Sequence, residues 1–225
     1  ALQDVYRSEG PGGLLELATR GRAPWIVGAL TPDALNVQSD LEDVLTLAFE
    51  RVNSGTNEVA SFSSMISGAF HAIDDDAKRE AVIVKISDGR PEAELARLFA
   101  LAPFGRSTWR LVDGLGEAAA KAYWDDVRPN LYRGAADEKQ EGTARLLEAR
   151  RPRAAFCSIN HELKEIEVEM LFNLMSAIAK EGNDKPGEYQ LDSYHIEEAF
   201  KILNASGRFN VDQMAGLEFA YMEVL

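Results

Sequence analysis

The sequence lacks the residues that several classes of protein require. It has a single cysteine, Cys157, so no disulfide can form within the chain and no cysteine-based zinc site is possible. No apolar run approaches the roughly 20 residues that span a bilayer, and no signal peptide is visible. These absences favour a cytoplasmic protein in a reducing compartment.

Basic residues are also scarce relative to acids. The chain of 225 residues has 24 Lys and Arg against 37 Asp and Glu, a net charge of −13, and both halves of the sequence are acidic. A strongly negative surface repels phosphate groups. We therefore expect neither nucleic acid nor a membrane among the partners.

Catalytic and metal-binding motifs are incomplete. Residues 161–165, HELKE, begin like the zinc motif H-E-x-x-H, but Glu165 stands where the second imidazole is needed. His195 and Glu198 have the spacing of half a di-iron site, and no second half exists. Residues 10–13 are glycine-rich but lack the lysine and the preceding strand of a phosphate loop. The sequence predicts no catalytic residue, no metal and no cofactor.

Two further features have a structural interpretation. Cys157 lies among apolar residues and is interpreted as a small buried side chain; it becomes a candidate nucleophile only if His161, one turn later, points the same way. The acidic run at residues 74–76 lacks the spaced ligands of a calcium loop. We interpret it as the N-terminal cap of a helix.

The patterning that is present is helical. Apolar residues recur at helical spacing throughout, most regularly at residues 62, 65, 66, 69, 70 and 73, and no hairpin signal separates alternating runs. Residues 79–87 contain three β-branched residues in a row, yet we predict a helix because no second strand is available to pair. Residues 22–30 form another helix, with Thr31 and Pro32 marking a new start. Capping boxes are predicted at residues 39–42 and 210–213.

Residues 104–129 are predicted to be the centre of the fold. They read as an αα-hairpin in which Gly114 and Gly116 end the first helix with a left-handed cap. Each helix has one apolar inner face and one tryptophan, Trp109 or Trp124. We expect both rings to be buried, because aromatic side chains at helical spacing usually pack in the core.

Eleven or more helices with short connections predict an all-α fold of serial antiparallel pairs, as in an α-solenoid superhelix. The pairs resemble HEAT- or TPR-like repeats. The segment with Trp109, residues 123–124 and residues 151–156 resembles the helical-repeat part of large bacterial proteins of unassigned function. The signature residues of a TPR are not present in order, so the resemblance transfers no functional residue. We expect one helical-repeat domain over residues 1–225, a fragment of a longer chain, with a sub-boundary near 129–136.

The functional hypothesis is a non-catalytic helical scaffold that binds another protein or a neighbouring domain of its parent chain. The candidate partner-binding residues are Trp124, Asp125 and Asp126, together with Arg150, Arg151 and Arg153. These three arginines form a basic cluster with Arg145, which we interpret first as satisfying the carbonyl groups and dipole at a helix C-terminus, and otherwise as a docking site for an acidic partner. The alternative is an all-α small-molecule-binding or hydrolytic enzyme with Asp125, Asp126, Glu198, His161 or His195 in a groove. A regulatory sensor module inside a multidomain ATPase or defence protein stays open as a third possibility.

Overall fold

The computed structural model describes residues 1–35, 37–55, 57–131, 134–181 and 189–222. Over these residues the fold is all-α: thirteen α-helices and one 3-10 turn, 77% helix, and no strand. The described residues form two compact units, Ala1–Val127 and Arg128–Leu225, and each is considered by itself. No helix among the described residues is long and apolar enough to cross a membrane.

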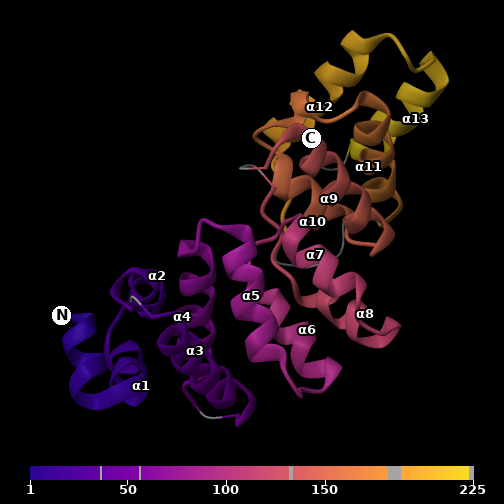
Figure 1. The fold of residues 1–225 in the computed structure, drawn as a ribbon. Coiled ribbons are helices and arrows are strands. Elements are labelled where there is room, and N and C mark those ends of the chain that lie inside the picture. Colours follow the sequence, from indigo (N-terminus) through magenta and orange to yellow (C-terminus); the bar gives the residue numbers. More distant parts are fainter. Residues whose placement is uncertain (36, 56, 132–133, 182–188, 223–225) are drawn as a thin grey trace. The chain divides into compact units, whose positions relative to one another are not determined.

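The first unit contains eight helices, with α1–α4 at one end and α7 and α8 at the other (Figure 1). Most of its helices contribute one apolar stripe to the core, as the periodicity predicts, whereas the buried residues of α2 are only Gly28 and Thr31. The helices are α1 (Leu2–Arg20, bent at Gly10), α2 (Pro24–Ala34), α3 (Gln38–Asn53), α4 (Val59–Ala72), α5 (Asp76–Ser87), α6 (Glu92–Ala100), α7 (Arg106–Asp113) and α8 (Glu117–Asp126).

The closest helix packing in this unit is between α2 and α4. A Cβ atom on Gly28 would lie 1.8 Å from the carbonyl oxygen of Met65, and one on Gly68 would lie 2.2 Å from the carbonyl oxygen of Trp25. The two backbones therefore touch directly, and only glycine fits at either position. The cost of a glycine inside a helix is offset here by the contact that it permits.

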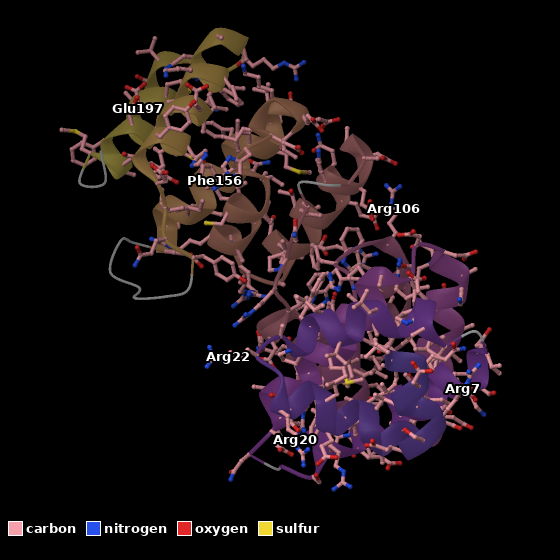
Figure 2. The ribbon with its side chains drawn as sticks, turned by 90° about the vertical axis from the view of Figure 1, so that its left-hand side faces the viewer. Arg7, Arg20, Arg22, Arg106, Phe156 and Glu197 are labelled. Carbon is pink, nitrogen blue, oxygen red and sulfur yellow. The ribbon has the colours of Figure 1, made fainter. Side chains whose placement is uncertain are left out.

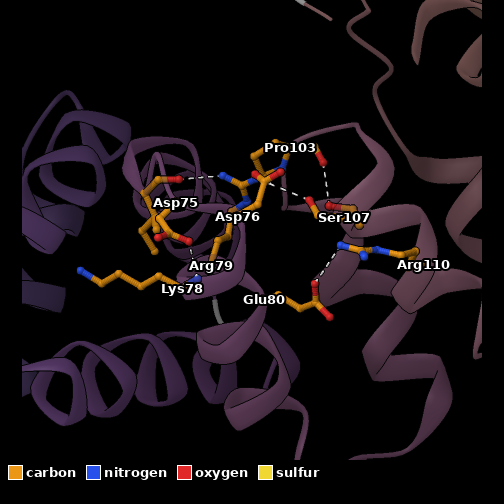
Figure 3. A network of polar contacts seen from close by, with 10 residues as sticks. Asp75, Asp76, Lys78, Arg79, Glu80, Pro103, Ser107 and Arg110 are labelled. Carbon is orange, nitrogen blue, oxygen red and sulfur yellow. Dashed lines mark hydrogen bonds and ion pairs between the residues drawn. The ribbon is translucent and has the colours of Figure 1, made fainter. Parts of the chain in front are cut away.

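Arg79 connects α5 to the C-terminal end of α4 and to α7. Its buried guanidinium donates to the carbonyl oxygen of Ile73 at 2.7 Å, pairs with Asp76, and lies 3.4 Å from the hydroxyl of Ser107 on α7 (Figure 3). Asp75 caps the same helix by accepting from the backbone N–H of Lys78 at 3.0 Å. The interpretation of residues 74–76 as a cap is thus confirmed, and the prediction of a helix over residues 79–87 is confirmed with it.

The second unit is organised around α11 (Val168–Glu181), which packs against all four other α-helices of the unit. Figure 2 shows Phe156 among these helices. The hydroxyl of Tyr221 donates to the carbonyl oxygen of Met175 at 2.8 Å and so attaches the last helix to the core. The remaining elements are α9 (Ala136–Glu148), α10 (Pro152–Ile159), the 3-10 turn η1 (Leu163–Glu165), α12 (Ser193–Ser206) and α13 (Val211–Tyr221).

Several local predictions are wrong. The capping box at residues 39–42 does not form, because α3 begins earlier, after Val37, with no side-chain cap. Gly114 is right-handed, with φ −83°: the chain leaves α7 through 3-10 bonds and needs no left-handed residue. No new helix starts at Thr31, because α2 continues through Pro32. The capping box of Asn210 and Gln213 is confirmed.

The central hairpin is also less self-contained than expected. α8 packs chiefly against α6, and the backbone N–H of Gly116 donates to Glu92 of that helix at 3.2 Å. Trp109 is fully buried, but Trp124 is only half-buried, so the prediction of burial is wrong for the second ring. The reason is geometric: α8 turns Tyr123 and Ala119 toward the core and leaves Trp124 at its edge.

Candidate functional site

A pocket of about 380 Å³ lies in the second unit, where the chain between α10 and α11 meets the first turns of α12. Both halves are placed by tight local structure: the η1 turn holds one side, and Asp192 caps α12 by accepting from the N–H of Tyr194 at 2.9 Å. The pocket is lined by Asn160, His161, Glu162, Leu163, Lys164, Glu165, Tyr194, His195, Glu198 and Ile202.

Two imidazoles meet edge to face in this pocket. The ring centroids of His161 and His195 are 4.9 Å apart at 86°, and the ring of Tyr194 lies 5.3 Å from His195. The Nδ1 atom of His195 is 3.5 Å from a carboxylate oxygen of Asp192. The side chain of His195 is only 12% exposed, whereas His161 is open to solvent. This arrangement places one accessible and one shielded imidazole side by side.

The acidic groups at one edge of the pocket are neutralised by Lys139 of α9. Its buried ammonium pairs with Glu162 and donates to Glu165 at 2.6 Å. Burial by itself lowers the pKa of Lys139, but the bonds to the two carboxylates outweigh it and the net pKa is raised. Lys139 therefore stays charged at neutral pH.

Glu198 is neutralised in a similar way on α12. It accepts from Lys201 at 2.7 Å, and this bond, together with the nearby side chains of Lys201, Lys164 and His195, lowers the pKa of the Glu198 carboxyl. Once these pairs are formed, the lining groups that remain to contact a ligand include the two imidazoles and the ammonium of Lys164, with the side-chain amide of Asn160 and the hydroxyl of Tyr194 beside them. Such a set suits a small anion.

The sequence indicated only part of this pocket. Of the five residues proposed for an enzymatic groove, His161, His195 and Glu198 come together here, while Asp125 and Asp126 lie on α8 of the other unit. The partner of His161 is therefore not at position 165 but 34 residues away. Over the described part of the chain, no group of three or more His, Cys, Asp or Glu side chains is placed to hold a metal ion.

Cys157 does not belong to this pocket. Its thiol is partly buried and lies 3.5 Å from the carbonyl oxygen of Gln190, and burial raises the pKa of the Cys157 thiol against a smaller opposite effect of Arg153. A thiol with a raised pKa is a poor nucleophile at neutral pH. The side chain of His161 packs against His195 instead.

The residues predicted to bind a partner lie on different units. On α8, Trp124 contacts the rings of Phe104 and Tyr123 at 6.1 and 5.0 Å, Asp125 pairs with Lys121, and Asp126 is exposed. These side chains occupy the surface beside a half-buried ring, and their role in binding stays a prediction.

The basic cluster lies in the second unit, around the turn between α9 and α10. Arg150 occupies the left-handed region with φ 58°, Arg151 lies over the ring of Tyr189 at 5.6 Å, and Arg153 pairs with Glu181 at 3.6 Å. Two of these three arginines are thus engaged within the unit. Their role in binding also stays a prediction.

The first unit has a feature that the sequence analysis missed. α2 is apolar around its whole circumference, with Asp33 as its only charged residue. The helix packs on α4 through Gly28, and the side chains of Trp25, Ile26 and Leu30, which point away from that contact, are exposed at 48%, 53% and 53%. A helix that is apolar all round is normally covered on all sides. This signal was readable in residues 24–34, where large apolar residues occupy more of the helix circumference than the one stripe that packs on a core.

Over the described residues the chain is an all-α protein of two compact helical units, one with the pocket and the other with the exposed face of α2. No family model matches the chain, and neither a curated protein nor a solved structure is similar to it.

Proposed function

We propose that the protein is a non-catalytic helical scaffold that binds another protein chain, and that the outer face of α2 is where it does so. The observation that carries this proposal is the exposure of Trp25, Ile26 and Leu30 on a helix whose other face is already packed. Large apolar side chains gathered on one exposed face are typical of protein–protein contacts. In our proposal the helices form solenoid-like antiparallel pairs, and such pairs would give this surface a rigid support.

The test is a photo-crosslinking amino acid placed at position 30 of the full chain, in cells that express the protein. We expect a covalent protein adduct of defined mass, because the partner covers this face. The matched control is the same amino acid at position 84, since Val84 on α5 is equally exposed at 52% and lies outside the α2 face. Equal labelling at the two positions, or none at position 30, contradicts the proposal.

A second candidate function is the binding of a small anion, phosphate or carboxylate, in the pocket of the second unit. The observation that favours it is the convergence of His161, His195 and Lys164 after the nearby acids have been neutralised. This convergence is also what the enzyme alternative requires of its groove.

This candidate predicts a specific response in histidine NMR. Adding millimolar inorganic phosphate is expected to shift the imidazole signals of both His161 and His195, because both rings face the bound anion. His71 on α4 of the first unit serves as the internal control, since it lies outside the pocket. Three unshifted signals, or equal shifts of all three, rule out an anion site here.

A further inference from the structure

The outer face of α2 has opposite charges at its two ends. Arg22 lies just before the helix and Asp33 lies in its last turn, and both are exposed. Figure 2 shows Arg22 projecting from the surface of the first unit. Among the described residues neither side chain has an ion-pair partner. Both charges are therefore available to a molecule that covers the face.

The order of residues along this face is self-complementary. When two α2 helices lie antiparallel about a two-fold axis between Val27 and Gly28, Trp25 comes opposite Leu30 of the second copy and Ile26 comes opposite Ala29. In the same register Arg22 comes opposite Asp33. Every contact then occurs twice, as a two-fold interface requires. The apolar residues meet in the middle and an opposite-charge pair closes each end.

We propose that the protein that covers α2 is a second copy of this chain, paired through this antiparallel register; the proposal rests on the scaffold function and names its partner. Charge supports this choice. A chain with a net charge of −13 repels its own copies, so it can associate only where acids are few and compensated. The face of α2 meets that condition, because its single acid lies opposite an arginine.

The size of the surface sets the strength of the dimer. An 11-residue helix is roughly 16 Å long. Three half-exposed apolar side chains bury much less than the roughly 800 Å² per partner of a stable interface. The association is therefore expected to be weak and to depend on protein concentration.

The decisive experiment mixes two charge-reversal variants of the full chain in sedimentation equilibrium. Arg22→Asp makes both ends of the face acidic and Asp33→Arg makes both ends basic, so each variant alone is expected to dimerise about tenfold more weakly than the natural chain. An equimolar mixture is expected to recover association, because each charge again meets its opposite. Both residues are exposed, so neither change disturbs folding.

The apolar centre is tested with a matched pair of substitutions. Ile26→Glu is expected to abolish association, while Val84→Glu, at nearly equal exposure on α5, leaves it unchanged. A natural chain that stays monomeric at hundreds of micromolar, or a mixture that associates no better than its components, overturns the dimer. If the chain is monomeric but position 30 crosslinks to a different protein, the dimer is wrong and the scaffold function stands.

Discussion

Gly28→Ala and Gly68→Ala are each expected to lower the free energy of unfolding by about 3 kcal/mol or more. An added Cβ would lie 1.8 Å from the carbonyl oxygen of Met65 in the first variant and 2.2 Å from that of Trp25 in the second. Ordinary contact begins near 3.4 Å, and a carbonyl oxygen inside a helix cannot swing away as a side chain does. The two helices must therefore separate, and the packing along α2 is lost with them.

The sign of this effect distinguishes it from the usual behaviour of glycine. Replacing a helical glycine by alanine ordinarily stabilises a protein by about 0.4–1 kcal/mol, because the unfolded chain loses freedom. Gly12→Ala in α1 is the control: this glycine is exposed, and a Cβ atom there meets nothing within 4 Å. Urea unfolding followed by circular dichroism measures all three variants. Stabilisation by Gly28→Ala would contradict the close packing of α2 on α4.

The packing of α2 on α4 could be predicted only in part from the sequence. Gly28 and Gly68 each lie inside a helical pattern, where glycine destabilises the helix. Such a glycine indicates that the position has a packing or functional role. The reason here is that each glycine lies against the backbone of the other helix, Gly28 at Met65 and Gly68 at Trp25, and this is a tertiary contact. No periodicity along the chain identifies it.

The pocket of the second unit could likewise be predicted only in part. The spacing of His195 and Glu198 was visible, and so was the incomplete zinc motif at residues 161–165. Their meeting depends on how α12 packs against the η1 turn, which is a tertiary contact. Lys139 pairs with two acids about 25 residues away, and the pattern of apolar and polar helix faces does not predict this pairing.

The type of the elements and one of the caps were predicted more successfully. The helix over residues 79–87 follows from the absence of any strand that could pair with it, a global argument that overrode β-branched propensity. The cap at Asn210 forms because its side chain reaches the N–H of Gln213 at 2.9 Å, whereas Ser39 lies inside α3 and has no free N–H to cap. Apolar periodicity thus identified the helices, and the packing of the folded chain decided their exact ends.

The second large effect is expected at Trp109. Trp109→Ala should lower the free energy of unfolding by about 3–5 kcal/mol, because the ring is fully buried and its removal leaves a large cavity. That is a large part of the roughly 5–15 kcal/mol that stabilises a typical domain. Urea unfolding of the purified variant measures it, and the variant is expected to be partly unfolded at room temperature.

Trp124→Ala provides the matched comparison, since both tryptophan rings contact Phe104, at 5.1 Å for Trp109 and 6.1 Å for Trp124. Trp124 is half-buried at the edge of α8, so its loss should cost only about 1–2 kcal/mol. The difference between the two variants therefore measures burial and not aromatic contact alone. Equal and small losses would mean that residues 104–129 are not central to the first unit. Equal and large losses would mean that Trp124 is covered in solution, as expected if the surface with Asp125 and Asp126 binds a partner.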